Sequence, residues 1–398
     1  SEGETKPVLT GKVSFAGGAM PEGTQMTIEN LAFENTYIHL VAWSQTTNLD
    51  KMGGLTIRNN TFAGTPDEAD SIYAIHINNG DMAVNNLTIT GNVFTNCGTG
   101  SGGCVFATAC GDLVVTGNEF RNSTMNALTL IGKDSTGNKT ASAVISGNVF
   151  DGWAAQPENR TDGRAMRLSY FDCDVDLTQN SFVSTNLPEE YIKLTDGKKA
   201  DVDKCYWGGE APSIDKLLGV SPVLSYYTDA EMTHLVVSTS AVAEAGGNYF
   251  TTLQAAIDAA EDGETVTLLK DTVENVKVSN QIILNLNGKT LTNADKGSIG
   301  NEAMTIWVAV SGDLEVIGSG TVQITKAAGA AVFNQGTVTL SGGTYERPEG
   351  TQGYVLFNSV GAEMTLNEGI TASSADPKSS LAAFDAGKNG SRSTVTIN

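Results

Sequence analysis

A short motif that recurs along the first half of the chain constrains the fold more than any other feature. Each copy alternates apolar and other residues over four positions, followed by a turn residue, an Asn, one variable residue and an aromatic residue. Neighbouring copies begin 25 to 32 residues apart, and a repeat of about 20 to 50 residues is typical of stacked-repeat proteins. Five close copies occupy residues 55–62, 87–94, 113–120, 143–150 and 175–182, and weaker copies occupy 26–33 and 200–207.

Alternation with a period of two indicates a strand rather than a helix. If each repeat forms one coil stacked on the next, the Asn side chains form one column and can hydrogen-bond from coil to coil. The aromatic side chains then form a second, buried column. We therefore predict an all-β fold, a right-handed parallel β-helix solenoid. The Asn column comprises Asn60, Asn92, Asn118, Asn148 and Asn180, and the aromatic column comprises Phe62, Phe94, Phe120, Phe150, Phe182 and Trp207.

A change of pattern after Trp207 predicts two consecutive β-helix units. The first unit covers residues 1–230, and its segment 220–227 is expected to cover the last coil, since an open strand edge invites aggregation. The second unit covers residues 231–398, where short strands alternate with Gly-rich turns.

A short α-helix at about 251–261 is predicted to open the second unit and to cap its first coil. Thr251 and Gln254 form a predicted capping box at its start. Four apolar residues share one helix face, as expected for a helix that packs on a core. They are Leu253, Ala256, Ile257 and Ala260.

The chain has 45 acidic and 24 basic residues, and therefore a formal net charge of −21. Nucleic acids need a basic surface, so no nucleic-acid partner is expected. No apolar run is long enough to span a bilayer, so no membrane insertion is expected in this segment. An acidic surface keeps a secreted protein soluble, and we expect an extracellular or cell-surface location.

The cysteines say little about the compartment. Their spacing has no paired C-x-x-C arrangement, so a zinc site is not expected. Cys97 and Cys104 flank the Gly-rich segment 98–103 and could form a disulfide, whereas Cys205 replaces Asn in the last copy of the motif and is expected to be buried.

The Asn-x-Phe repeats and the segment Tyr206-Trp-Gly-Gly209 with Pro212 resemble the pectate-lyase-like superfamily of right-handed β-helix proteins. The segment 249–260 resembles the helix that caps the first coil of pectinesterases. Segments 263–271 and 284–291 are similar to modules in large cell-surface proteins of Gram-positive gut bacteria. The resemblance implies the fold and a surface location, but this fold hosts lyases, hydrolases and adhesins alike.

The catalytic residues of those enzymes do not carry over to this sequence. The Asn-Thr-Asp, Asp-Asp and Gly-His-Gly motifs of polygalacturonase-like hydrolases do not occur. The second unit lacks the Gln-Asp pairing and the Arg that pectinesterases place after their capping helix. Pectate lyases need calcium-binding carboxylates with a basic residue, and only part of such a set can be assembled. The sequence therefore favours a protein without catalytic activity.

Three carboxylates could hold a calcium ion at the end of the first unit. In the repeated strand the second and fourth residues point outwards, which places Asp176 and Asp201 in one column about 4.8 Å apart with Asp203 beside them. Carboxylates this close raise one another's pKa unless a cation neutralises them, and calcium suits several oxygen ligands. The alternative is an acidic end that water and Lys204 screen.

A second outward column comes from another strand of each coil. Aligning the apolar flanks of these strands places six outward residues in line: His39, His76, Phe106, Thr129, Arg167 and Lys193. An aromatic ring with hydrogen-bonding neighbours suits sugar binding, and we predict a ligand site at His39, His76, Phe106 and Arg167, bordered by Tyr37. An ordinary mixed β-surface is the alternative interpretation.

Three long inserts could wall this face: residues 65–71, 132–139 and 151–164. Loops on a rigid scaffold commonly carry function. Trp153, Arg160, Asp162 and Arg164 are expected on such a wall.

The first functional hypothesis is an extracellular, non-catalytic repeat protein that binds glycans or a protein partner at the cell surface. A polysaccharide lyase or glycoside hydrolase acting in a groove of the first β-helix is an alternative, and a structural spacer is another.

Overall fold

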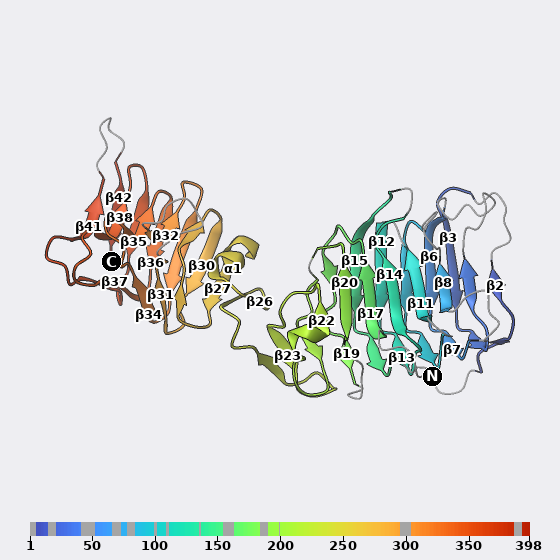
Figure 1. Ribbon diagram of the computed structural model, residues 1–398. Helices are drawn as coiled ribbons and strands as arrows, with labels where there is room; N and C mark the ends of the chain where they lie inside the picture. Colours follow the sequence, from blue (N-terminus) through green and yellow to red (C-terminus); the bar gives the residue numbers. More distant parts are fainter. Residues whose placement is uncertain are drawn as a thin grey trace. The chain divides into compact units, whose positions relative to one another are not determined.

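The computed structural model describes residues 5–14, 21–40, 52–65, 73–77, 84–98, 102–108, 111–134, 137–153, 163–183, 190–198, 200–294, 304–385 and 392–398. The chain forms two compact units, residues 1–236 and 237–398, and each is a stack of short strands (Figure 1). The boundary lies beyond the predicted position after residue 230, because β24 (Leu235–Val237) still extends a sheet of the first unit.

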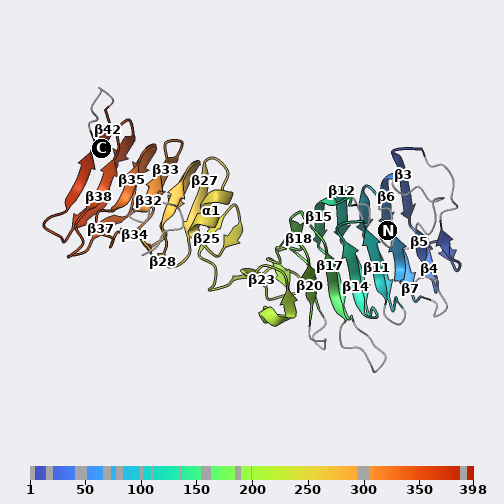
Figure 2. The ribbon, with the colours of Figure 1, turned by 45° about the horizontal axis from the view of Figure 1, so that its top comes forward.

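The first unit is a parallel β-helix with three sheets that follow the stack of coils (Figure 2). Within each sheet, strands of successive coils pair in the parallel sense. The β1–β24 sheet contains β1 (Val8–Leu9), β4 (Ala32–Glu34), β7 (Thr61–Ala63), β10 (Val93–Thr95), β13 (Glu119–Arg121), β16 (Val149–Asp151), β19 (Ser181–Phe182), β21 (Cys205–Tyr206), β23 (Ser225–Tyr227) and β24. The β2–β22 sheet contains β2 (Val13–Ser14), β5 (Ile38–Leu40), β8 (Tyr73–Ile77), β11 (Gly103–Thr108), β14 (Asn126–Ile131), β17 (Arg164–Ser169), β20 (Ile192–Thr195) and β22 (Leu217–Leu218). The β3–β18 sheet contains β3 (Thr24–Glu29), β6 (Met52–Arg58), β9 (Leu87–Thr90), β12 (Gly111–Thr116), β15 (Thr140–Ser146) and β18 (Val175–Asp176).

The predicted Asn column is confirmed as a buried ladder. The side chain of Asn118 shows the pattern: its Nδ2 donates to Oδ1 of Asn148 at 3.0 Å, and its Oδ1 accepts from Nδ2 and the backbone N–H of Asn92, both at 3.0 Å. Nδ2 also donates to the carbonyl of Ile89 at 2.8 Å. The ladder amides therefore join the coils to one another and satisfy buried backbone groups at the bend.

The residue before each ladder position has a left-handed backbone, which explains the Gly or Asn found there. At Gly91, Gly117 and Gly147, φ is 64°, 63° and 64°, a conformation that glycine adopts without a steric cost. The other four copies have Asn30, Asn59, Gln179 and Lys204 at the same turn, with φ between 55° and 59°.

The predicted aromatic column is confirmed as a continuous stack of buried rings. Ring centroids lie 4.5, 4.7, 4.9, 5.1 and 5.2 Å apart from Phe33 to Phe182, and Trp207 closes the stack 4.2 Å from Phe182. The two weak copies of the motif thus belong to the same helix as the five close ones. Segment 220–227 also closes the stack as predicted, because β23 pairs with β21.

The second unit is a shorter parallel β-helix. Its β26–β42 sheet contains β26 (Asn248–Phe250), β25 (Ala243–Ala245), β27 (Glu264–Leu268), β30 (Gln281–Asn285), β33 (Asp313–Ile317), β36 (Thr337–Leu340), β39 (Glu363–Leu366) and β42 (Thr394–Ile397). The β28–β40 sheet contains β28 (Thr272–Val273), β31 (Lys289–Thr292), β34 (Gly320–Gln323), β37 (Thr344–Arg347) and β40 (Thr371–Ser374). The β29–β41 sheet contains β29 (Val276–Val278), β32 (Met304–Val308), β35 (Ala330–Asn334), β38 (Tyr354–Asn358) and β41 (Ser380–Phe384). Only β25 pairs in the antiparallel sense, with β26 and β27, among the pairs that the described residues form within this unit.

The predicted helix is α1 (Leu253–Ala259), and its apolar face is buried on the first coil as expected. The predicted capping box is wrong. Thr252, not Thr251, is the N-cap, and its hydroxyl oxygen accepts from the backbone N–H of Ala255 at 3.1 Å. The Glu274 carboxylate accepts from the first two helical N–H groups at 2.8 and 2.9 Å. Since Glu274 belongs to a later segment of the coil, local sequence spacing could not reveal this cap.

Candidate functional site

The predicted outward column of the first unit is formed by the register of the β2–β22 sheet. His39 lies opposite His76, His76 opposite Phe106, and Phe106 opposite Thr129. Thr129 in turn lies opposite Arg167, which lies opposite Lys193. Strands in a sheet are about 4.8 Å apart, so one face presents these six side chains at regular intervals.

The N-terminal half of this column is a packed aromatic cluster. The His39 and His76 rings lie 5.3 Å apart, and His76 lies 5.0 Å from Phe106. Tyr73 contacts both His76 and Phe106, at 5.5 and 5.3 Å. Tyr37 and His39 are only 6 % and 7 % exposed, so a ligand can reach His76 and Phe106 more readily than the two residues predicted beside them.

Tyr73 is a member of this cluster that the sequence did not single out. It lies three residues before His76 at the start of β8, outside the alternation that placed the other members. Burial raises the pKa of its phenol, while a hydrogen bond with Thr129 and the charge of Arg167 lower it. Tyr73 therefore links the aromatic half of the column to its polar half.

His76 is neutral at pH 7. Burial and, to a smaller extent, the neighbouring His39 lower the pKa of His76 to about 4. Two imidazoles at this distance cannot both carry a proton without repulsion. The pair is thus suited to packing and hydrogen bonding rather than to holding an anion.

The C-terminal half of the column is basic and accessible. Arg167 is exposed and Lys193 is half-buried, and the two lie on neighbouring strands. Within the described residues, neither side chain forms an ion pair with a carboxylate. The ion pairs found there involve other basic residues: Arg58, Arg121, Lys139, Arg164, Lys198 and His234.

Two residues predicted on a loop wall have structural roles instead. Trp153 is 3 % exposed and packs edge-on against Tyr191 and Phe182, at 5.4 and 6.2 Å. Arg164 is buried and ion-paired with Glu190 at 2.5 Å. Arg160 and Asp162 lie outside the described residues, as do most of the 65–71 insert and residues 135–136 of the 132–139 insert.

The predicted calcium site is not assembled. Asp176 and Asp201 do lie side by side, as a parallel bridge. Asp203, however, is 7 % exposed, and its Oδ1 accepts from the backbone N–H groups of Leu224 and Ser225 at 2.6 and 2.9 Å. The described residues contain no group of three or more His, Cys, Asp or Glu side chains that could hold a metal ion.

Asp203 is instead an internal cap for the closing segment. Burial raises the pKa of its carboxyl to about 6, although the hydrogen bond from Leu224 opposes the shift. From the sequence, an outward side chain is predicted for Asp203, because the alternation of the strand is extended to the end of the last copy of the motif. The strand at the start of that copy pairs with the preceding strand through a single bridge, Asp176 to Asp201, so alternation no longer fixes the direction of Asp203.

The disulfide considered between Cys97 and Cys104 is not formed. Cys97 and Cys104 are both buried and free of a disulfide. Cys205 is buried as expected, and its thiol donates to the carbonyl of Leu177 at 3.1 Å.

The second unit has an outward column that the sequence analysis missed. The register of the β29–β41 sheet aligns Lys277, Trp307, Phe333, Phe357 and Ala383. All five are half-buried. Their strands lack the Asn-x-Phe motif that identified the first unit, but the aromatic residue falls at the fourth position of β32, β35 and β38 alike, and this spacing could have revealed them.

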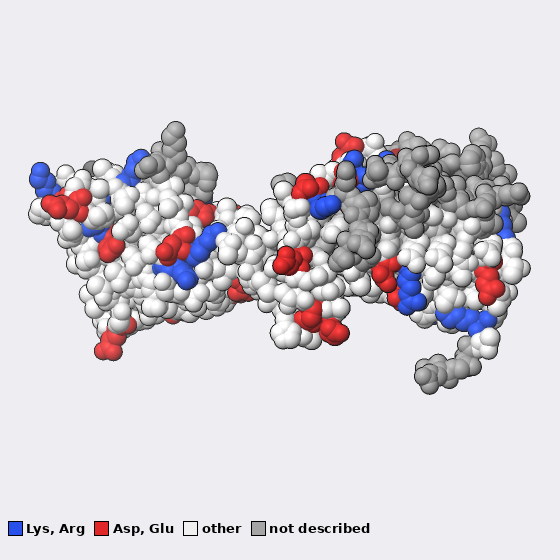
Figure 3. All heavy atoms as spheres, turned by 60° about the horizontal axis from the view of Figure 1, so that its bottom comes forward, with Lys and Arg blue, Asp and Glu red and all other residues white. Residues whose placement is uncertain are grey.

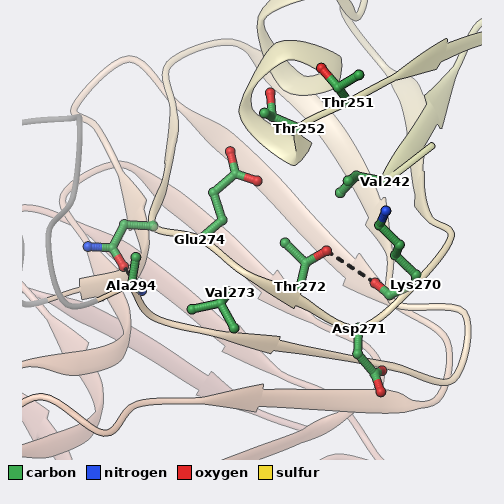
Figure 4. A pocket seen from close by; sticks show the side chains of 10 residues that line it. Val242, Thr251, Thr252, Lys270, Asp271, Thr272, Val273, Glu274 and Ala294 are labelled. Carbon is green, nitrogen blue, oxygen red and sulfur yellow. Dashed lines mark hydrogen bonds between the residues drawn. The ribbon is translucent and has the colours of Figure 1, made fainter. Parts of the chain in front are cut away.

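A pocket of about 490 Å³ lies beside the start of α1 (Figure 4). Its charged side chains are occupied by the fold. Lys270 donates to the carbonyls of Thr239 and Ser240, and Asp271 accepts from the N–H of Thr290. Glu274 points toward Thr252, where it caps the helix. We therefore assign this pocket no chemistry.

A second pocket, of about 370 Å³, adjoins the aromatic column of the second unit. It is lined by Ala327, Ala328, Gln352, Gly353, Tyr354, Lys378 and Ser380. The Tyr354 ring contacts Phe357 edge-on at 5.0 Å, which joins the pocket to the column.

The chain's net negative charge is not gathered in one place on the face shown in Figure 3, where acidic side chains form small separate groups. Within the described residues, no helix has the length and apolar character needed to cross a membrane.

These observations define a parallel β-helix with outward columns of side chains. The family described as right handed beta helix region matches residues 17–205, the part that carries most of the Asn ladder and ring stack. The match supports a right-handed winding and, in general terms, a pectate-lyase-like fold. No curated protein and no solved structure matches the chain.

Proposed function

We propose that this chain is a non-catalytic binding protein of the cell surface or the extracellular space, whose first unit binds an extended acidic glycan. The observation that carries the proposal is the pair formed by Arg167 and Lys193. Two cations on neighbouring strands repel each other, and an anion that bridges them removes this repulsion.

The rest of the column supplies the other contacts of such a ligand. The half-buried rings of Phe106 and His76 offer apolar edges on the same face, whereas Thr129 and Tyr73 are buried beneath it. A glycan that follows the coil axis meets a new strand every 4.8 Å or so, which is close to the length of one sugar unit. His39 and Tyr37, which are nearly buried, pack against the N-terminal end of the ring cluster.

Arg is well suited to this role, because its guanidinium group can bind both oxygens of a carboxylate. The net charge of −21 does not prevent the interaction. At physiological ionic strength, charges more than about 8 Å away are largely screened, so the local pair dominates.

A catalytic role on the same face is the second candidate. Lyases of this fold class combine a basic side chain with calcium-binding carboxylates, and Arg167 could serve as the former. The acidic residues predicted for the latter do not gather into a metal-binding set, which is why binding without cleavage is favoured.

The test is calorimetric titration of the full chain with an oligogalacturonide and with its carboxyl-reduced, neutral counterpart. The double change Arg167→Ala with Lys193→Ala should weaken binding of the acidic chain tenfold or more, since charge-assisted hydrogen bonds contribute about 1.5–3 kcal/mol. Arg121→Ala is the matched control, because Arg121 is an exposed Arg on a different sheet.

Assays for reducing ends and for unsaturated uronate would run in parallel. Release of either product would replace the binding proposal by the enzymatic one. No binding to any acidic glycan would favour a structural spacer.

A further inference from the structure

We propose that the pocket beside Tyr354 in the second unit binds a carboxylate-bearing sugar residue. This inference shares its ligand class with the proposed function and in that respect rests on it, but it uses none of the same residues.

A buried arginine gives the pocket a fixed shape. Arg347 is 1 % exposed and donates to four backbone carbonyls, those of Lys326, Gly329, Thr351 and Tyr354, at 2.5 to 3.1 Å. These carbonyls belong to the two bends that contribute Ala327, Ala328, Gln352 and Gly353 to the pocket lining. A guanidinium group with all its donors used in this way holds both bends in place.

The bends are tightly packed around this arginine. A Cβ added to Gly353 would lie 2.5 Å from Nη2 of Arg347 and 2.8 Å from the carbonyl oxygen of Gly329. The backbone N–H of Ala328 also donates to the carbonyl of Gln352 at 2.7 Å, which joins the two bends directly. The pocket is thus largely preformed, as ligand sites usually are.

The lining side chains match the parts of an acidic sugar. Tyr354 provides a half-exposed ring, and Ser380 lies opposite it in the β-sheet register with its hydroxyl exposed. Lys378 is exposed and forms no ion pair among the residues that the structure describes. One aromatic wall, one hydroxyl and one cation are what a sugar ring with a carboxylate requires.

The half-exposed column extends the site beyond the pocket. Phe357 contacts Tyr354, and Phe333 stacks on Phe357 at 5.2 Å. At the far end, Nζ of Lys277 lies 4.7 Å from the centre of the Trp307 ring, and Nε1 of Trp307 donates to Gln335 at 2.9 Å. The column therefore offers apolar edges and a second cation to the remainder of a glycan chain.

The experiment uses the full chain, an oligogalacturonide and its carboxyl-reduced counterpart, with calorimetry as the readout. Lys378→Ala should weaken binding of the acidic chain at this site several-fold and leave any binding of the neutral chain unchanged. Tyr354→Ala should weaken both. Ser380→Trp should block the pocket without removing a core residue, and therefore abolish binding there at an unchanged melting temperature. Lys289→Ala, on the β28–β40 sheet, is the matched control.

The outcomes separate this site from that of the first unit. Binding that is lost in the Arg167 and Lys193 variant but unaffected by Lys378→Ala and Ser380→Trp overturns the inference and leaves the proposed function standing. The reverse result supports the inference and moves glycan binding to the second unit. Two sites per chain, each lost separately, support both proposals, and failure of every acidic probe to bind overturns both.

Discussion

The two units form the same kind of coil but stabilise its interior differently. In the first unit, a ladder of buried amides and a stack of aromatic rings run through successive coils. In the second unit, the core consists mainly of aliphatic residues closed at one end by α1. Its amide contact between Asn334 and Asn358, at 2.7 Å, joins two coils and continues no long ladder in the described residues.

The difference between the two interiors shows which kind of core requires a repeated sequence motif in a β-helix. A polar group inside a core must find a partner in the next coil, so an Asn ladder forces the same residue to recur at each turn. Aliphatic cores tolerate varied side chains of suitable volume, so the second unit can keep the fold without an obvious motif.

On the outside, the two units resemble each other more closely. Each has one sheet with an outward column that combines aromatic rings and cations. In the first column only the His39 ring is buried, and the rings of His76 and Phe106 are half-buried like those of the second column. Aromatic residues inside and outside the coils should therefore differ strongly in their contribution to stability.

Phe120→Ala should have the largest effect. Phe120 is fully buried between Phe94 and Phe150, and removing a buried Phe costs about 3–5 kcal/mol because a cavity remains. Phe333→Ala, in the outward column of the second unit, should cost roughly a third of this value, since its ring is already partly in water. Hydrogen exchange measured by peptide would give the loss for each unit separately. Equal losses would contradict the distinction between inner and outer rings.

Asn118→Ala should have the next largest effect, on the order of 1–3 kcal/mol, because it leaves buried partners in two neighbouring coils without a hydrogen bond. The loss of exchange protection should extend to the coils of Asn92 and Asn148 on both sides. Asn334→Ala in the second unit should affect a shorter region, because its ladder contact is with Asn358. An unchanged melting temperature for Asn118→Ala would show that the ladder is not needed.

Contacts between equivalent positions of successive coils could be predicted from the sequence, whereas contacts from segments outside the repeat could not. The repeated motif predicted the Asn ladder and the ring stack, because stacking places equivalent residues side by side. For the same reason, the aligned apolar flanks of a second strand predicted the register of His39, His76, Phe106 and Arg167. The motif could not reveal that Glu274 caps α1, because Glu274 comes from a different segment of the chain. It also could not show that Trp153 folds back onto the ring stack, since a loop residue has no periodicity to orient it.

Asp203 lies where the periodicity of the first unit ends. Changing it should have the smallest effect on stability of the three predictions. Its pKa in the folded chain, about 6, lies above the ordinary value of 3.8 because the carboxyl is buried, and Asp201 adds repulsion while Lys204 opposes it. The Asp203 carboxyl therefore binds its proton more tightly in the folded state than in the unfolded state. The two states differ in protonation mainly between pH 3.8 and about 6. By linkage, the stability from this group is fully present below about pH 4 and is lost as the pH rises through 6.

His76 acts in the opposite direction over the same range. Its folded pKa, about 4, lies below the ordinary 6.5, so its contribution is lost as the pH falls from about 6.5 through 4. The dependence of wild-type stability on pH therefore combines two opposing effects, one from Asp203 and one from His76. Comparison of the wild type with Asp203→Asn isolates the first, because the Asn carbonyl can still accept from Leu224 and Ser225 but carries no charge.

We expect Asp203→Asn to be more stable than the wild type at pH 7 by on the order of 1–2 kcal/mol, after allowing for partial solvent screening, and about equally stable at pH 4. Denaturant unfolding across this range would measure the difference, with Glu210→Gln, at an exposed carboxylate, as the control. If Asp203→Asn were instead less stable at pH 7, the charged carboxylate would be the preferred partner of the two N–H groups. The end of the first unit would then depend on a buried charge rather than on the neutral contacts that hold its other coils together.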